Sequence, residues 1–226
     1  MPDYSKPDHW SIKAQKEGYP ARSVYKLKEM DEKFGLVKTG TIHFKALDMG
    51  AAPGSWSLYI LRKLSGKLSG KIPGKLQAPA DTHGNDPKPV SLVAIDLSPL
   101  SGSYDQGLFE KPEFVFIRGD FTNSDIREAI LSHGPYSLIV SDAAPATSGN
   151  RSLDTLRSLE LAETVLDYAR TALVPGGNLV IKVFQGGDTG NLLKTIRGLF
   201  KTGKGFKPEA CRAESFETYY LGLGKK

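Results

Sequence analysis

Residues 43–64 read HFKALDMGAAPGSWSLYILRKL, and this stretch decides the fold. A compact apolar run ends at Asp48, a turn with Gly50 and Gly54 follows, and apolar residues then recur at helical spacing up to Leu64. The order of strand, tight turn and helix is typical of an open parallel sheet, in which ligands bind beyond the carboxyl ends of the strands. We expect a ligand at this turn, because a glycine lets it approach the backbone without a clashing Cβ.

The alternation of strands and helices continues along the chain. Further strands are expected at 91–96, 114–117, 136–141 and 178–184, and helices at about 21–34, 152–173 and 189–200. This alternation predicts parallel pairing with right-handed crossovers. Phe206-Lys207-Pro208 and residues 215–223 are expected to add an antiparallel edge pair. The sequence therefore predicts the α/β class, with a doubly wound sheet and a final hairpin.

Two carboxylates at the ends of strands favour an adenosine ligand. Asp96 ends the second expected strand, where it can accept hydrogen bonds from ribose hydroxyls. Asp120 follows the third strand and can face an adenine amino group. A nicotinamide-dependent dehydrogenase is disfavoured, because the third glycine of its usual turn is missing and no substrate domain is evident.

An ordered set of four charged residues is the second chemical feature: Lys26, Asp142, Lys182 and Glu217. Asp142 and Lys182 lie in or at the end of runs that otherwise predict buried strands, where a free charge is costly unless it is paired or used. Lys26 and Glu217 taken singly would be ordinary surface residues. As a set, and with the glycine turn, the four residues indicate a methyltransferase that binds S-adenosylmethionine and acts on RNA.

Four segments resemble the signatures of the FtsJ family of RNA 2′-O-ribose methyltransferases. They are residues 48–57, Gly119-Asp120-Phe121, Ser141-Asp142-Ala143-Ala144-Pro145 and Lys182-Val183-Phe184-Gln185-Gly186. The resemblance runs from about Arg22 to the C-terminus. It implies a Rossmann-like S-adenosylmethionine-dependent methyltransferase fold, whose seven-stranded, mostly parallel sheet has one antiparallel edge hairpin strand and helices on both faces. Within the family, the chain is most similar to bacterial members that methylate a uridine ribose of large-subunit ribosomal RNA.

The resemblance also implies a set of site residues. The catalytic residues that it implies are Lys26, Asp142, Lys182 and Glu217, and the cofactor-binding residues are Gly54, Trp56, Asp96, Asp120 and Asp142. The chain departs from the family pattern at Ser55, Ala146 and Phe216, which bear on RNA contacts rather than on the chemistry.

Each member of the charged set has a role in the expected reaction. Methylation of a ribose 2′-hydroxyl needs the developing alkoxide stabilised and the oxygen aligned with the S–CH₃ bond. We assign Lys182 to the hydroxyl, Asp142 to orient that lysine, Lys26 to electrostatic support, and Glu217 to anchor a lysine or the ribose. Lys182 can serve as a base or as a charged stabiliser, and the sequence leaves both open.

Composition points to an RNA partner in the cytoplasm. The net charge of +5 and pI near 9.1 favour a polyanion. A single cysteine, Cys211, excludes an internal disulfide framework, and the histidines lack metal-ligand spacing, so neither export nor a catalytic metal is expected. No stretch approaches the ~20 apolar residues of a membrane span. We expect a monomer that binds RNA within the large ribosomal subunit, and not DNA or a membrane.

The expected domain organisation is a short arm and one α/β domain. Residues 1–20 form a basic and aromatic arm that can hold phosphates and stack on bases, and residues 21–226 form the methyltransferase domain. Residues 65–89 are rich in Gly, Lys and Pro and predict a surface insertion. A solvated loop explains them better than a basic finger on RNA.

Three other functions stay open on the sequence. The substrate could be transfer RNA or another RNA. A non-catalytic RNA-binding protein is disfavoured, because it would have no need of all four charged residues. A small-molecule methyltransferase would be expected to have an apolar lid and less basic flanks.

Overall fold

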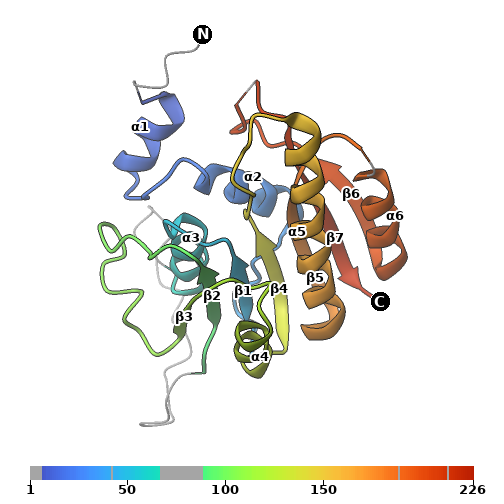
Figure 1. The fold of residues 1–226 in the computed structure, drawn as a ribbon. Helices are drawn as coiled ribbons and strands as arrows, with labels where there is room; N and C mark the ends of the chain where they lie inside the picture. Colours follow the sequence, from blue (N-terminus) through green and yellow to red (C-terminus); the bar gives the residue numbers. More distant parts are fainter. Residues whose placement is uncertain (1–6, 42, 67–88, 188, 213) are drawn as a thin grey trace.

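In the computed structural model, residues 7–41, 43–66, 89–187, 189–212 and 214–226 are described, and they form a seven-stranded sheet with helices on both faces (Figure 1). The strands lie in the order β3-β2-β1-β4-β5-β7-β6. Their bounds are β1 Ala46–Met49, β2 Leu92–Asp96, β3 Phe114–Arg118, β4 Tyr136–Ser141, β5 Leu173–Phe184, β6 Phe200–Phe206 and β7 Glu217–Lys225. The helices are α1 His9–Lys16, α2 Val24–Phe34, α3 Ser55–Leu64, α4 Ser124–Ser132, α5 Arg151–Ala172 and α6 Thr189–Leu199.

The connection order reverses beside β1, and this reversal positions the site. β1 pairs in parallel with both β2 and β4, so that Met49 lies next to Ile95 on one side and Ser141 on the other. The chain first builds outward through β2 and β3 and then returns to β4. Crevices for ligands form at such a switch point, beyond the carboxyl ends of the strands.

The two faces of the sheet are covered by different halves of the chain. Ala94 and Val140 point into a core with α1, α2 and α3, whereas Ile95 and Ile139 point into a core with α4, α5 and α6. Because successive side chains of a strand alternate between faces, one strand contributes to both cores. The predicted doubly wound sheet with helices on both faces is confirmed.

The C-terminal hairpin forms, but its first strand lies earlier than expected. The prediction placed it at Phe206-Lys207-Pro208, whereas β6 ends at Phe206. β6 contains two glycines, Gly203 and Gly205, and because glycine is depleted in strands, the sequence of this segment does not indicate a strand. β7 pairs antiparallel with both β5 and β6, and it lies between them, so β6 and not the antiparallel strand forms the edge of the sheet.

The N-terminal segment contains a helix where an arm was expected. Residues 9–16 form α1, with Asp8 accepting a hydrogen bond from the Ser11 amide as its N-cap. Ala14 and Tyr19 are buried against the body of the protein. Most of the expected 65–89 insertion, residues 67–88, lies outside the described residues. No helix in the described part of the chain is both long and apolar enough to span a membrane.

Candidate functional site

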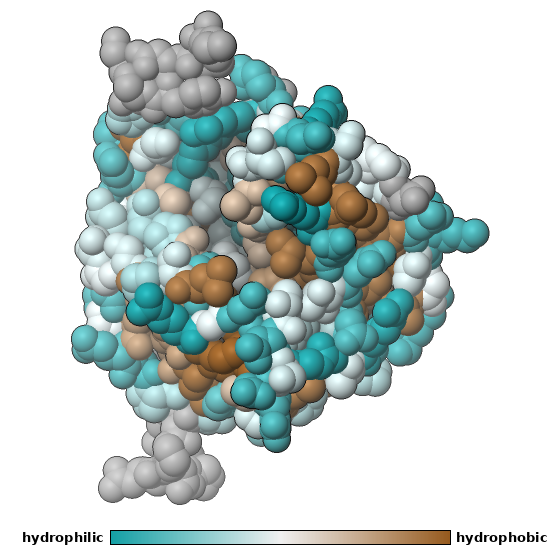
Figure 2. Space-filling model, in the orientation of Figure 1, coloured by the Kyte–Doolittle hydropathy of each residue, from teal (hydrophilic) through white to brown (hydrophobic). Residues whose placement is uncertain are grey.

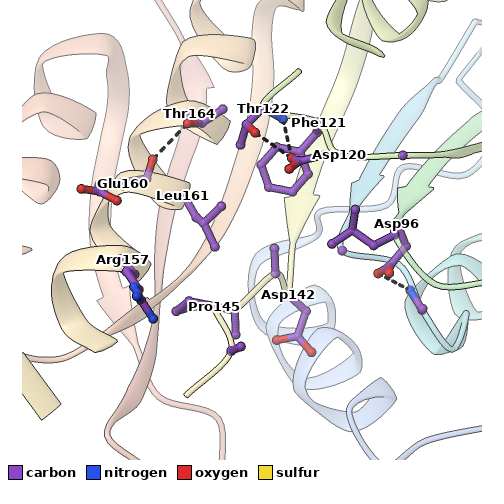
Figure 3. A pocket seen from close by; sticks show the side chains of 17 residues that line it. Asp96, Asp120, Phe121, Thr122, Asp142, Pro145, Arg157, Glu160, Leu161 and Thr164 are labelled. Atoms are coloured by element: carbon purple, nitrogen blue, oxygen red, sulfur yellow. Dashed lines mark hydrogen bonds between the residues drawn. The ribbon is translucent and has the colours of Figure 1, made fainter. Parts of the chain in front are cut away.

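A cavity of about 600 Å³ opens where β1 to β4 end, and α5 closes its far side (Figure 3). On the surface, it lies in the hollowed part of the face shown in Figure 2. The lining residues are Gly50, Ala52, Asp96, Leu97, residues 119–122, residues 142–146, Arg157, Glu160, Leu161 and Thr164. All four strand ends contribute, so the cavity exists only in the folded sheet.

The turn after β1 touches the loop after β4 at Gly50. Its φ is +78°, and a Cβ there would lie 2.7 Å from the backbone of Ala143. Gly54 has a φ of +106° and precedes α3. Both positions need glycine, Gly50 for close approach and Gly54 for its backbone conformation.

Two of the predicted cofactor residues are not among the residues that line the cavity. Gly54 and Trp56 are outside the lining set. The Trp56 ring is buried, and its Nε1 donates to the carbonyl oxygen of Ser23 at 2.8 Å. The Trp56 side chain therefore ties α3 to the start of α2.

Asp96 and Asp120 line the cavity and are held in place by backbone amides. Asp96 accepts hydrogen bonds from the Ala52 amide at 2.9 Å and the Ser98 amide at 2.8 Å. Asp120 accepts from both the amide and the hydroxyl of Thr122 through its Oδ1 atom. Leu97 beside Asp96 is 66% exposed and was not predicted as a site residue. Carboxylates beside an exposed apolar side chain suit an adenosine, which offers hydroxyls, an amino group and a flat ring.

The structure brings the four charged residues together as two ion pairs. Lys182 on β5 has its Nζ 3.1 Å from Asp142 Oδ1, and it also donates to the Asp142 carbonyl oxygen. Lys26 on α2 has its Nζ 2.7 Å from Glu217 Oε1. All four side chains are at most 17% exposed. Asp142 lines the cavity, so the cluster opens onto it.

Tyr219 joins the two pairs, and the sequence analysis missed it. Its hydroxyl donates to Asp142 Oδ1 at 2.7 Å, and its ring lies 5.9 Å from Lys26 Nζ. Tyr219 also pairs with Lys182 across the β5–β7 ladder. Strand alternation could have found it, because Tyr219 follows Glu217 by two residues and shares its face of β7.

The electrostatic interactions within the cluster keep Asp142 and Lys26 in their charged forms. Burial acts to raise the pKa of Asp142, but Lys182, Lys26 and the Tyr219 hydrogen bond outweigh it, so the pKa lies below its usual value. Burial acts to lower the pKa of Lys26, but Asp142 and Glu217 raise it overall. At neutral pH, Asp142 is therefore ionised and Lys26 is protonated. Within the described ranges, no three His, Cys, Asp or Glu side chains gather as a metal site would need.

The fold resembles solved methyltransferases. The chain aligns with a crystal structure described as a ribosomal RNA methyltransferase from Plasmodium falciparum, with a TM-score of 0.66 and 24% identity over 92% of this chain and 98% of that one. Human methyltransferase-like protein 13 in complex with SAH aligns with a TM-score of 0.53 and 12% identity over 87% of this chain and 80% of that one. At these identities the likeness shows the fold.

Comparison of sequences identifies the family of the chain, which the likeness in fold does not. Proteins named ribosomal RNA large subunit methyltransferase E are 45% identical in Treponema denticola, over 99% of this chain and 97% of the relative, and 41% identical in Borreliella afzelii, over 95% and 96%. The family model for FtsJ-like methyltransferases matches residues 19–225. This chain belongs to the FtsJ-like methyltransferase family.

Proposed function

We propose that the protein transfers a methyl group from S-adenosylmethionine to a ribose 2′-hydroxyl of RNA, at a uridine of large-subunit ribosomal RNA. The observation that carries the proposal is the lysine–carboxylate cluster at the cavity, in which Lys182 and Asp142 are in contact at 3.1 Å. The relatives named ribosomal RNA large subunit methyltransferase E support the choice of RNA.

The cavity fits the cofactor that the proposal requires. Its volume of about 600 Å³ is in the range of small-molecule and cofactor sites. We assign Asp96 to the ribose hydroxyls, Asp120 to the adenine amino group, and Leu97 to the face of the ring. The close approach of Gly50 to Ala143 forms a narrow floor of backbone. When bound, S-adenosylmethionine supplies a methyl group on a positively charged sulfur, and this charge suits the ionised Asp142.

Lys182 is the residue that we place at the 2′-hydroxyl. In the transfer, the hydroxyl oxygen would bond to the methyl carbon as the S–CH₃ bond breaks, and it would develop negative charge as it loses its proton. Lys182 would accept that proton if it is a neutral amine; if it is an ammonium, it would stabilise the charge while the proton passes to water. Asp142 and Tyr219 fix the geometry, since both Lys182 and the Tyr219 hydroxyl contact Asp142 Oδ1. Lys26, held protonated, adds positive charge near the oxygen.

Transfer of a radiolabelled methyl group tests the proposal. Purified ribosomal subunits and transfer RNA are incubated with labelled S-adenosylmethionine and either wild type or Lys182→Ala. We expect label as a 2′-O-methyl nucleotide in large-subunit ribosomal RNA, and a loss of at least about a hundredfold in the variant. Lys45→Ala is the matched control, because its Nζ contacts the carbonyl oxygen of His133 at the opposite end of the sheet and should not affect activity.

The possible outcomes separate the parts of the proposal. Label in transfer RNA alone would retain the chemistry and overturn the substrate. If no RNA is labelled although wild type binds S-adenosylhomocysteine in calorimetry, RNA methylation is wrong. The same calorimetry on Lys182→Ala distinguishes loss of chemistry from loss of the fold.

A further inference from the structure

Three side chains that the proposed reaction does not use are packed in series beside the charged cluster. The rings of Phe184 and Phe216 lie 4.7 Å apart, centroid to centroid, and are inclined by 57°. The Arg151 guanidinium lies over the Phe216 ring, 5.1 Å from its centroid. Phe184 is buried, Phe216 is partly exposed and Arg151 is exposed, so the series runs from the core to the surface. We call these three residues the aromatic–arginine column.

The column begins next to the residue that is assigned to the 2′-hydroxyl. Phe184 follows Lys182 by two residues on β5, so both side chains lie on one face of the sheet. Phe184 also pairs with Glu217 across the β5–β7 ladder. Phe216 directly precedes Glu217, and Arg151 is the first residue of α5. A ribose whose hydroxyl lies at Lys182 is therefore next to the inner end of the column.

Hydrogen bonds of the backbone hold the column together. The Phe184 amide donates to the Ser158 hydroxyl of α5 at 3.0 Å, and the Gln185 amide donates to the Phe216 carbonyl oxygen at 2.8 Å. These bonds connect the end of β5 both to α5 and to the segment before β7. The start of α5 accordingly lies beside the β6–β7 connection, as the Arg151–Phe216 contact requires (Figure 1).

The composition of the column suits a nucleobase. Unstacked bases of single-stranded RNA are bound by stacking on aromatic rings and on guanidinium planes. The column offers both surfaces at one place, with the partly exposed Phe216 ring and the exposed Arg151 guanidinium already in contact. Phe216 is also one of the three positions at which the chain departs from the family pattern. A role in stacking gives this departure a physical reason.

The chemistry of RNA brings a base to the column. In a nucleotide, the base is carried by C1′ of the ribose, next to the carbon that bears the 2′-hydroxyl. A hydroxyl delivered to Lys182 therefore brings a base to the surroundings of the charged cluster. The cavity at Asp142 is assigned to the cofactor, whereas the Phe184 side of the cluster offers aromatic surface.

We propose that the aromatic–arginine column binds a nucleobase of the RNA strand by stacking, with Phe216 and Arg151 in contact with the base and Phe184 as their support. The inference rests on the proposed function and deepens it, because it explains how the strand that presents its 2′-hydroxyl to Lys182 is held. Every base has a π face, so the column holds the strand without reading its sequence.

Phe216→Leu is the main test variant, because leucine keeps apolar packing against Phe184 and removes the aromatic face. Phe109→Leu is the matched control. Phe109 is partly exposed, and its ring stacks on that of the buried Phe114 at 4.9 Å. It lies on the connection between β2 and β3, and both of these strands are on the other side of the sheet from β5 and β7.

Two probes separate base stacking from contacts with the RNA backbone. Affinity for a labelled uridine decamer and for an abasic decamer with the same ribose–phosphate chain is measured by fluorescence anisotropy, with S-adenosylhomocysteine present. We expect wild type to prefer the uridine decamer, and Phe216→Leu to bind it about tenfold more weakly with unchanged affinity for the abasic decamer. The slope of log affinity against log salt should stay the same, because stacking releases no counterions. Phe109→Leu should resemble wild type.

Arg151→Gln tests the outer end of the column. We expect weaker binding of the uridine decamer and, because a positive charge is lost, a smaller salt slope. Since Arg151 and Phe216 form one stacking unit, the double variant should lose less log affinity than the sum of the two single variants. Arg170→Gln removes an exposed arginine in the last turn of α5 and should not reduce the preference for the uridine decamer.

Equal weakening of both decamers in Phe216→Leu, or equal effects of Phe216→Leu and Phe109→Leu, would overturn the inference. Calorimetry with S-adenosylhomocysteine shows that each variant is folded. Methyl transfer to ribosomal subunits is measured in parallel, and Phe216→Leu should raise the KM for RNA with little change in kcat. A wild type with the Phe216-dependent preference for bases that methylates no RNA would refute the proposed function and support the stacking site. Full methylation by Phe216→Leu with an unchanged KM would refute the stacking site alone.

Discussion

Asp142 has three charged or polar neighbours at once. Lys182 contacts its Oδ1 atom, the Tyr219 hydroxyl donates to the same atom, and Lys26 stabilises its ionised form. A buried carboxylate is costly without such partners, and here they come from α2, β5 and β7. The residue therefore couples the position of Lys182 to the packing of three separate elements.

Asp48 is a second buried carboxyl group, and its protonation state differs from that of Asp142. It is fully buried at the end of β1, and only its Oδ2 atom has a hydrogen-bond partner among the described residues, the Ser57 hydroxyl at 2.7 Å. Burial raises its pKa to about 7, despite the opposing hydrogen bond from Ser57. Below neutral pH, Asp48 therefore keeps its proton in the folded protein.

This shift predicts a pH-dependent loss of stability. The unfolded chain ionises Asp48 near its ordinary pKa of 3.8, whereas the folded protein does so near 7. As pH rises between these values, the unfolded state releases a proton that the folded state retains, so the free energy of unfolding falls. We expect the stability of Asp48→Asn relative to wild type to rise by about 1–4 kcal/mol from pH 5 to pH 7.5.

Urea unfolding at several pH values measures this difference. Asp125→Asn, at an exposed position in α4, controls for the loss of one carboxylate. A constant difference between Asp48→Asn and wild type across the range would show that Asp48 ionises in the folded protein as it does in the unfolded chain.

At the scale of elements, the cavity floor depends on how closely the β1–α3 turn approaches the loop after β4. Gly50→Ala would place a Cβ 2.7 Å from the Ala143 backbone and would also strain a φ of +78°. We expect a loss of about 1–3 kcal/mol in stability and at least about a tenfold loss of S-adenosylhomocysteine affinity. Calorimetric titration and urea unfolding measure the two effects.

Gly190→Ala is the matched control for that substitution. Gly190 lies in α6, and an added Cβ would meet nothing within 4 Å. Alanine in a helix is favoured over glycine, so this variant should equal or slightly exceed wild type in stability and bind the cofactor normally. Wild-type affinity in Gly50→Ala would show that the turn moves away from β4 without cost to the site.

For the whole molecule, the arrangement predicts that cofactor binding does not depend on the Lys26–Glu217 pair. The cofactor cavity draws on β1 to β4 and α5, while Lys26 and Glu217 line a second hollow, of about 260 Å³, between α2 and the β6–β7 connection. Since a ligand that binds only the folded state stabilises it by about 2.7 kcal/mol at a hundred times its Kd, S-adenosylhomocysteine should raise the Tm by about 5–10 °C.

Asp96→Asn and Glu217→Gln test this separation. We expect the ligand-induced rise in Tm to fall by half or more in Asp96→Asn and to persist in Glu217→Gln. Each variant is compared with itself without ligand, so a change in its own stability does not confuse the result. An equal loss of the rise in both variants would show that the two cavities form one binding site.

The whole molecule also presents apolar surface beside the site. On the face shown in Figure 2, hydrophobic surface gathers over α5, where Leu153 and Leu156 are exposed. Apolar residues therefore do not all lie on the buried face of α5. Its buried positions include Asp154, Thr155 and Ser158, so the polar pattern of the sequence does not match the buried face.

The sequence by itself determined the order of β1 to β5 and of helices α2, α3, α5 and α6, the glycine turn and the identity of the charged set, but it did not predict α1 and α4. Strand and helix periodicity is local, and so is the need for glycine at the positive φ angles of the turn, so predicting these features requires no knowledge of distant contacts. The family resemblance placed Asp96, Asp120 and the four charged residues, and the structure brings those four together.

Only the tertiary structure decided which charges pair, that Tyr219 joins the pairs, where β6 lies, and that a second hollow borders Lys26. Each of these depends on side chains from segments far apart in the chain. β6 is the clearest case, because the Phe200 ring fits where Gly222 of the neighbouring strand has no Cβ. No local pattern records such a contact, since its free energy arises only when the sheet has assembled.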